Sequence, residues 1–449
     1  MDENNLTGRV KRYGGVSKAV GGLAWKLASN KVLGTKLDKD QHSEALKLAL
    51  GNLKGPIMKA AQILATIPEA LPKEYAEELR QLQSNAPAMS WPFVRRRMKS
   101  ELGADWQSKF ADFEREATAA ASLGQVHRAT SETGEALACK LQYADMASAV
   151  EADVTQLKLA LKAYRAFDKA IDPSLALDEV TERLREELDY CLEAKHTELF
   201  RHIFAAEFAH FDTSLVNVPK IHTELSSSKL LTMSWLEGRP MMSLLKEGLD
   251  QDQRNSMAER MFYTWNLPLY HFGVVHGDPH LGNYAFTDDG KVNLLDFGCV
   301  RKFSAKFIEG TVELYRAKID QDEDRAVAAF ESWGFKNLSK DLIEVLDLWA
   351  DFLYAPVLQD KKLRISETSG IEKGAGIVQD VHKALREQGG VTIPPEFVFM
   401  DRAAVGLGSV YIHLDAELNW YQMFNNLIEG FETDLMGKRQ AEALAAVGL

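Results

Sequence analysis

The chain has 449 residues, a formal net charge of -12 at pH 7 and a hydrophobic fraction of 46%, a composition typical of globular proteins that excludes wholesale disorder. The negative charge repels phosphate backbones and therefore argues against nucleic acid as a partner. Three widely spaced cysteines, Cys139, Cys191 and Cys299, show no zinc-ligand spacing and fit a reducing cytoplasm.

The first 35 residues combine basic side chains with apolar residues at helical spacing, which are Val16, Val20, Leu23 and Leu27. Such a stripe either packs onto the body of the protein or rests on an anionic membrane surface. No run of about 18 apolar residues occurs, so membrane spanning is not expected. We therefore expect a cytoplasmic protein whose membrane contact, if any, is peripheral at the inner membrane.

The next elements are helices and then a β-hairpin. Helices separated by proline-marked turns are predicted between residues 43 and 83, and another helix over 95–102. Segments 117–129 and 137–142 flank a polar turn with glycine at Gly134, which predicts a hairpin. Helices are then expected over 147–167 and 178–204, and a strand over 229–235.

A second hairpin is predicted further along, where segments 283–287 and 291–295 are joined by Asp288-Asp289-Gly290. Beyond Phe303 the pattern is almost wholly helical. Strands therefore concentrate early in the chain and helices late, which predicts an α+β fold with two lobes.

The strongest chemical signal is His276-Gly277-Asp278 followed by Asn283 on the same loop, and by Asp296-Phe297-Gly298 after the second hairpin. Phosphoryl transfer needs a carboxylate beside the attacking oxygen and oxygen ligands for Mg2+. The hairpin can bring all three polar side chains to one magnesium–phosphate centre. We assign Asp278 as base or water-orienting group and Asn283 and Asp296 as metal ligands. Ordinary turns explain a lone Asp-Phe-Gly, but not this ordered combination.

Two upstream features fit nucleotide binding. Lys140 lies in an alternating apolar strand, and a lysine buried there needs a carboxylate or phosphate partner. Before it comes a run of small residues whose backbone amides can approach phosphate oxygens closely, consisting of Ala119, Ala120, Ala121, Ser122 and Gly124. An alanine run is also a common helix segment, so this run is weak evidence alone.

Together these motifs resemble the UbiB/AarF family of atypical kinase-like proteins from about Gly55 to Trp420. The resemblance implies a two-lobed protein-kinase-like fold with three parts. These are an N-terminal helical extension (1–100), an N-lobe with the alanine-rich loop and a helical insert (101–237), and a mostly helical C-lobe with the catalytic and metal-binding loops (238–449). It also implies ATP or ADP with Mg2+ as cofactors and a role in ubiquinone biosynthesis. Lipids, quinone precursors and quinone-biosynthesis proteins are the partners it suggests.

The family pattern extends the set of site residues. Lys140 matches the phosphate-binding strand lysine, and either Glu187 or Glu193 is its expected partner, with Glu193 favoured. Met233 and Trp235 match the hinge that grips adenine through backbone groups.

The family's KxGQ helix corresponds here to Lys59-Ala60-Ala61-Gln62, with Ala61 in place of glycine. Lys59 and Gln62 share one face of a helix and can meet the nucleotide pocket together. In the family this helix covers the protein-substrate site and favours ATPase activity, so Ala61 bears directly on its fit.

The leading hypothesis is therefore an atypical kinase-like ATPase. No Ala-Pro-Glu motif follows Asp296, which argues against an ordinary peptide-substrate groove. Two alternatives stay open: a small-molecule phosphotransferase of the aminoglycoside or choline type, and a non-catalytic scaffold switched by nucleotide.

Overall fold

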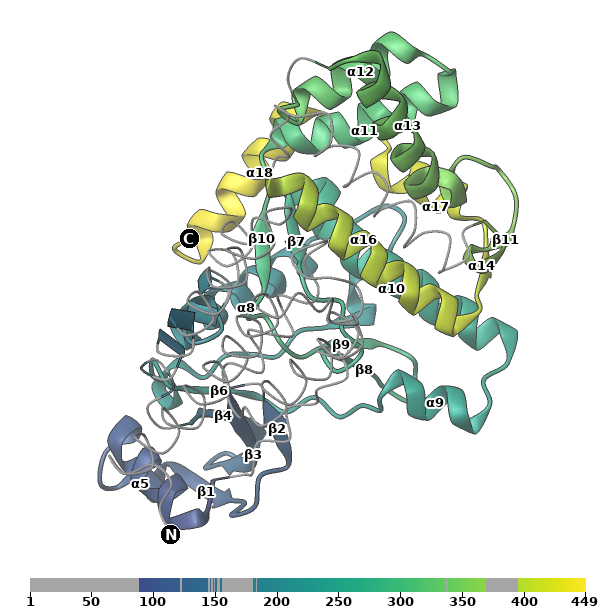
Figure 1. Cartoon of the computed structure of the whole chain (residues 1–449). Helices are drawn as coiled ribbons and strands as arrows, with labels where there is room; N and C mark the ends of the chain where they lie inside the picture. Colours follow the sequence, from purple (N-terminus) through teal and green to yellow (C-terminus); the bar gives the residue numbers. More distant parts are fainter. Residues whose placement is uncertain are drawn as a thin grey trace, which may run out of the picture. The chain divides into compact units, whose positions relative to one another are not determined.

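The computed structural model describes residues 89–121, 123–143, single positions between 146 and 155, and residues 181–182, 184–335, 338–368 and 395–449 (Figure 1). They form two compact units. One comprises the chain up to Asp189 with Leu225–Thr232, and the other comprises Tyr190–Glu224 and Met233–Leu449. The basic N-terminal stripe, the helices predicted between 43 and 83, and Lys59 and Gln62 lie outside the described residues, as does most of the helix predicted over 147–167.

A five-stranded sheet forms the frame of the first unit. Its order is β1 (Phe110–Phe113), β3 (Gly124–Ser131), β4 (Ala136–Gln142) and β6 (Leu230–Ser234), with β2 (Ala119–Ala121) paired to the start of β3. The first predicted hairpin and the predicted strand near residue 230 are both present. In the β3–β4 turn Gly134 has a φ of +86°, a left-handed conformation that glycine adopts without steric penalty.

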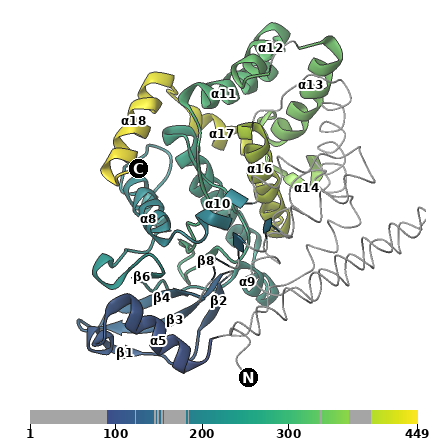
Figure 2. The ribbon, with the colours of Figure 1, turned by 60° about the vertical axis from the view of Figure 1, so that its left-hand side comes forward.

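Helix α5 (Trp91–Leu102) covers one face of this sheet (Figure 2). Val94 and Met98 of the helix pack with Leu137, Cys139 and Leu141 of β4 in one apolar cluster. Because side chains alternate along a strand, Ala138 and Lys140 lie on the other face, where both are half-buried. The register sets Val126 opposite Lys140, so these two residues share that face.

The helix predicted over 178–204 is interrupted, which corrects that prediction. Residues 184–186 are helical, Glu187 and Leu188 form a turn, and α8 begins only at Tyr190 and ends at Phe204. Gln142 of β4 donates its side-chain amide to the carbonyl of Leu188 at 3.1 Å. The sheet thus supplies a partner to a carbonyl that a continuous helix would have used within its own backbone.

Helix α10 (Gln251–Phe272) is the central element of the second unit. A reciprocal capping box between Asp250 and Gln253 starts it, and Gly273 ends it with a φ of +60°. Figure 1 shows α16 (Pro395–Leu414) running alongside it, and the helix also contacts α8, α17 (Trp420–Ile428) and α18 (Thr433–Ala446). Trp265, Trp349 and Trp420 are almost completely buried in the surrounding apolar core.

The remaining elements include five helices and three small sheets. The helices are α9 (Met241–Glu247), α11 (Ala305–Asp320), α12 (Glu323–Ser332), α13 (Lys340–Tyr354) and α14 (Ile365–Thr368). The sheets pair β7 (Val274–His276) with β10 (Val300–Lys302), join β5 (Val216–Asn217), β9 (Val292–Leu294) and β8 (Tyr284–Phe286), and pair β11 (Leu363–Arg364) with β12 (Glu417–Leu418). The last pair is a small departure from the all-helical pattern expected after Phe303. No helix in the described part of the chain combines the length and apolar character needed to cross a membrane.

Candidate active site

The loop that carries Asp278 is held between the end of α10 and strand β10. The chain leaves α10 at Gly273 and enters β7, where His276 lies opposite Val300. Gly277 then donates its backbone N–H to the carbonyl of Cys299 at 2.7 Å. This pairing sets the residues after β7 beside the residues before β10, so the Asp278 loop and the Asp296-Phe297-Gly298 segment are neighbours.

Asn283 holds Asp278 in place. Its side-chain amide donates one hydrogen bond to Oδ2 of Asp278 and a second to the Asp278 carbonyl, both at 3.0 Å. Both hydrogen bonds use the amide nitrogen of Asn283, whereas Oδ1 of the same amide can act only as an acceptor or a metal ligand. Both residues are half-buried, so the carboxylate has a defined position and solvent access.

His276 is a structural link between the two loops. Its Nε2 bonds the carbonyl of Asp296, and its Nδ1 lies 3.4 Å from the backbone nitrogen of Asp278. A carbonyl only accepts and a backbone N–H only donates, so these bonds fit the tautomer with hydrogen on Nε2. Trp265 of α10 also donates its indole N–H to the His276 carbonyl at 3.1 Å. The histidine therefore positions both acidic residues from a buried site.

The second predicted hairpin is present as β8 and β9, with Tyr284 opposite Leu294. Gly290 occupies its turn with a φ of +80°. At the open end Leu295 donates its N–H to the carbonyl of Asn283 at 2.9 Å. Asn283 accepts this closing hydrogen bond, and Asp296 directly follows its donor, Leu295. The two residues are therefore close together at the open end of the hairpin.

These two residues fit a hard divalent cation in the chemistry of their donors. An amide oxygen and a carboxylate are ligands that Mg2+ accepts, with phosphate oxygens and water completing the shell. Oδ1 of Asp296 also accepts the N–H of Gly298 at 2.9 Å, which orients the carboxylate. Among the described residues no group of three or more His, Cys, Asp or Glu side chains is arranged to hold a metal. A protein-only cage is not needed for this type of site.

Helix α8 contacts the Asp296-Phe297-Gly298 segment through residues that sequence reasoning missed. His196 bonds the carbonyl of Phe297 through Nδ1 at 3.2 Å, and the ring of Phe200 lies 5.2 Å from the ring of Phe297. Glu193 lies on the same helix, three residues before His196, and is buried. In the sequence, His196 follows the candidate Glu193 by three residues and therefore shares its face of a helix; this spacing is the one signal that would have identified it.

Another missed contact comes from α16. A Cβ atom added to Gly406 would lie 2.5 Å from Cγ of Pro279, the residue after Asp278. Glycine at this position lets the helix press closely against the loop that carries Asp278. The contact joins residues 127 positions apart, and no local pattern in the sequence indicates it.

The predicted hinge residues lie at and after the end of β6. Met233 is buried and forms a bridge with Ile221, while Trp235 is half-buried. The following segment is fixed to β8, because Arg239 and Phe286 exchange both backbone hydrogen bonds, at 2.7 and 2.9 Å. The hinge segment is thus attached to the same hairpin that carries Asn283 and Asp296.

The other candidate residues belong to the first unit. Lys140 is half-buried on β4, Gly124 is buried at the start of β3, and Glu187 is half-buried in the turn before α8. The alanine-rich segment is a strand, β2, and the turn to β3 follows it. Ala119 is exposed, Ala120 and Ala121 complete β2, and Ser122 lies outside the described residues.

Several known proteins are similar to this chain in sequence or in fold. The ABC1 atypical kinase-like domain matches residues 81–330, more than half of the chain. An uncharacterized protein of Synechocystis sp. is 31% identical over 66% of this chain and 76% of its own length. The mitochondrial atypical kinase COQ8B of Rattus norvegicus is 26% identical over 75% of this chain and 66% of its own length. The atypical kinase COQ8 of Saccharomyces cerevisiae is 28% identical over 60% of this chain, and the match spans 52% of its own length.

Among solved structures, the Rv3197–erythromycin complex of Mycobacterium tuberculosis matches 90% of this chain and 99% of its own, with a TM-score of 0.59 and 24% identity. This likeness concerns the fold, and it confirms the α+β kinase-like architecture expected from the sequence. The matching domain and the relatives confirm the family resemblance as well. The chain is thus a member of the ABC1/UbiB family of atypical kinase-like proteins.

Proposed function

We propose that the chain is an atypical kinase-like ATPase that binds MgATP or MgADP. The main support is the arrangement of Asp278, Asn283 and Asp296 at the open end of one hairpin. It offers a carboxylate for the attacking oxygen and two oxygen ligands for a divalent cation. Relatives named atypical kinases share the family.

In this proposal each residue has a distinct task. Asp278 accepts the proton of the attacking water or hydroxyl group at its carboxylate. Asn283 through Oδ1 and Asp296 through its carboxylate hold Mg2+, which neutralises phosphate charge when bound. Lys140 binds phosphate oxygens as a point charge, with Glu193 or Glu187 as its acidic partner.

The nucleotide contacts and the biological context are further parts of the proposal. Backbone amides of the β2–β3 hairpin cover the phosphates, and backbone groups beside Met233 and Trp235 receive adenine. Lys59 and Gln62 regulate access from the extension. Support of ubiquinone or other isoprenoid quinone biosynthesis, or of lipid metabolism, rests on the family resemblance alone. Cytoplasmic location, peripheral membrane contact and quinone-biosynthesis partners stay predictions.

The test is phosphate release from MgATP by wild type, by Asp296→Asn and by Asp288→Asn as a matched control. Asp288 is exposed in the turn of the same hairpin, so its substitution changes the same charge away from the site. Assays are run with and without anionic liposomes and a phenolic quinone-precursor mimic. We expect Asp296→Asn to reduce turnover by about 100-fold or more and Asp288→Asn to leave it unchanged.

Other results would replace the proposal with one of its rivals. Magnesium-dependent nucleotide binding without turnover under any condition identifies a nucleotide-switched scaffold. Transfer of phosphate to a small hydroxylated acceptor, with no release to water, identifies a small-molecule phosphotransferase.

A further inference from the structure

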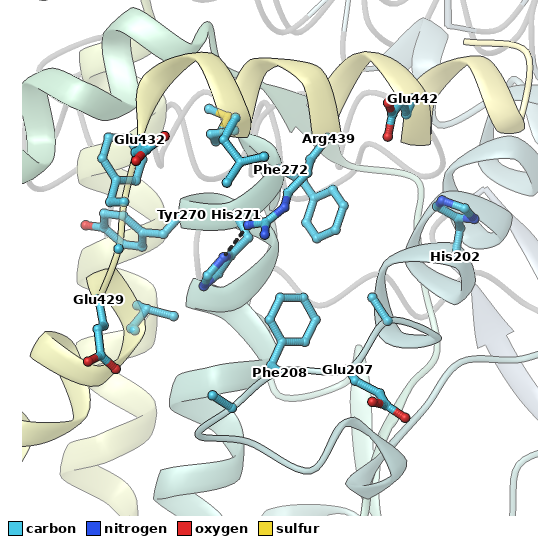
Figure 3. A pocket seen from close by; sticks show the side chains of 17 residues that line it. His202, Glu207, Phe208, Tyr270, His271, Phe272, Glu429, Glu432, Arg439 and Glu442 are labelled. Carbon is cyan, nitrogen blue, oxygen red and sulfur yellow. Dashed lines mark hydrogen bonds between the residues drawn. The ribbon is translucent and has the colours of Figure 1, made fainter.

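The second unit contains a pocket of about 420 Å³, and its described lining includes none of Asp278, Asn283 and Asp296. It is formed by the C-terminal ends of α8 and α10, the segment after α17, and one side of α18 (Figure 3). Its volume lies in the range of sites for small organic ligands, about 300 to 1,000 Å³. The pocket therefore has the size of a binding site separate from the proposed phosphoryl-transfer site.

Part of the pocket wall is apolar and aromatic. Tyr270, Phe272 and Met436 line it and are buried. Phe208 lies edge-on to His271 at 5.0 Å and to Phe272 at 6.3 Å, which extends the aromatic surface outward. A ligand with an apolar or aromatic body would cover these rings and remove apolar area from water.

The rim carries excess negative charge. Four exposed glutamates line the pocket, against one arginine, Arg439; the glutamates are Glu207, Glu429, Glu432 and Glu442. They come from three separate segments, which Figure 3 shows placed around the opening. Carboxylates that surround a cavity with low-dielectric walls produce a local negative potential, which attracts cations and repels anions.

The positive charge of Arg439 is directed to His271. Its guanidinium lies 3.3 Å from Nδ1 of His271, as the dashed line in Figure 3 shows. A guanidinium only donates, so Nδ1 accepts and the imidazole is neutral with hydrogen on Nε2. Burial, together with the guanidinium, lowers the pKa of His271 to about 4. This histidine therefore adds no positive charge to the lining at neutral pH.

We propose that this pocket binds an amphipathic organic cation, an amine with an apolar or aromatic body. The body lies against Phe208, Tyr270 and Phe272, and the ammonium group lies at the rim among the glutamates. The aromatic faces add attraction to the cation through their ring quadrupoles. A carboxylate or phosphate ligand would meet four glutamates and only one guanidinium, although one of the glutamates, Glu429, also binds the ring of His210 at 2.6 Å.

The test uses three probes of the same shape: 1-naphthalenemethylamine, the uncharged 1-naphthalenemethanol and the anionic 1-naphthoate. Binding to the full chain is measured by ligand-observed NMR and calorimetry. The site variant replaces all four rim glutamates by glutamine. A control variant makes the same net-charge change on exposed glutamates elsewhere, at Glu132, Glu259, Glu331 and Glu344. A third variant, Ala209→Trp, fills the pocket from an exposed lining position. Thermal melting confirms that each variant is folded.

We expect the amine to bind about tenfold more tightly than the alcohol, since several weak charge pairs act together. The rim variant should lose this preference, the control should keep it, and Ala209→Trp should abolish binding. Three results would overturn the proposal: equal binding of the three probes, no amine binding up to about 10 mM, or amine binding that persists in Ala209→Trp. Because nucleotide turnover is not the readout, failure here leaves the proposed ATPase activity untouched.

Discussion

The side-chain amide of Asn283 donates to both Oδ2 and the backbone carbonyl of Asp278, at 3.0 Å each. The residue proposed as a metal ligand thus also positions the proposed base. Two substitutions separate these tasks, because aspartate retains an oxygen ligand but cannot donate a hydrogen bond.

We expect Asn283→Asp to reduce ATP turnover as severely as Asn283→Ala, by about 100-fold. In the aspartate variant the base loses its donor and gains a neighbouring like charge. Steady-state kinetics at saturating Mg2+ measures this. If Asn283→Asp keeps near-normal turnover while Asn283→Ala loses it, ligation of the metal is the only task of Asn283.

Gly406 should be intolerant of any side chain. Gly406→Ala places a methyl group 2.5 Å from Pro279, so the Asp278 loop or α16 must shift. Overpacking of this kind costs about 1–3 kcal/mol, and turnover should fall with it. Urea unfolding and ATP turnover of the variant provide the two measurements.

The matched control for Gly406 is Gly408→Ala on the same helix, where nothing lies within 4 Å of the added methyl. Alanine is a better helix former than glycine, so this variant should gain about 0.8–1 kcal/mol. Equal effects of the two substitutions would show that contact with Pro279 is not what requires Gly406.

Substitutions at Gly277 and Cys299 should have non-additive effects on the free energy of unfolding. A methyl group at Gly277 would lie 2.9 Å from Sγ of Cys299 and 3.3 Å from its carbonyl oxygen. Gly277→Ala should therefore lower stability by about 1–3 kcal/mol. Cys299→Ala removes the sulfur, so the double variant should recover part of this loss. A double-mutant cycle in urea measures the coupling energy, and strictly additive effects would contradict the contact.

His271 should make stability depend on pH. Burial, then the guanidinium of Arg439, lowers its folded-state pKa to about 4 from an ordinary 6.5. The unfolded chain therefore binds the proton more tightly. The stabilisation is fully present above pH 6.5 and is lost as pH falls from 6.5 towards 4, by about 3 kcal/mol in all.

His271→Asn removes this titration, so the free energy of unfolding should fall less steeply over that pH window than in wild type. Urea midpoints measured in steps between pH 4.5 and 7.5 give both curves. Parallel curves would mean that His271 titrates alike in the folded and unfolded chain.

Several local features of the fold followed from short-range sequence patterns. The β8–β9 hairpin depends on the Asp-Asp-Gly turn, where Gly290 adopts the left-handed conformation, and on backbone bonds between residues close in sequence. The β3–β4 hairpin depends similarly on Gly134. By contrast, the break before α8 was not predicted; the carbonyl of Leu188 in this break binds Gln142, a sheet residue 46 positions away that no local pattern connects to it.

The amino-acid sequence alone determined the family, the α+β class, and the order and spacing of the polar residues around Asp278 and Asp296, because turns and strand alternation are local and motif intervals can be read directly. Only the tertiary structure decided which distant elements press on that loop and where the pocket beside His271 lies. Contacts such as Gly406 with Pro279, His196 with Phe297, and Arg439 with His271 arise from helix packing. Packing depends on the summed fit of many apolar side chains across long sequence separations, and no local pattern encodes it.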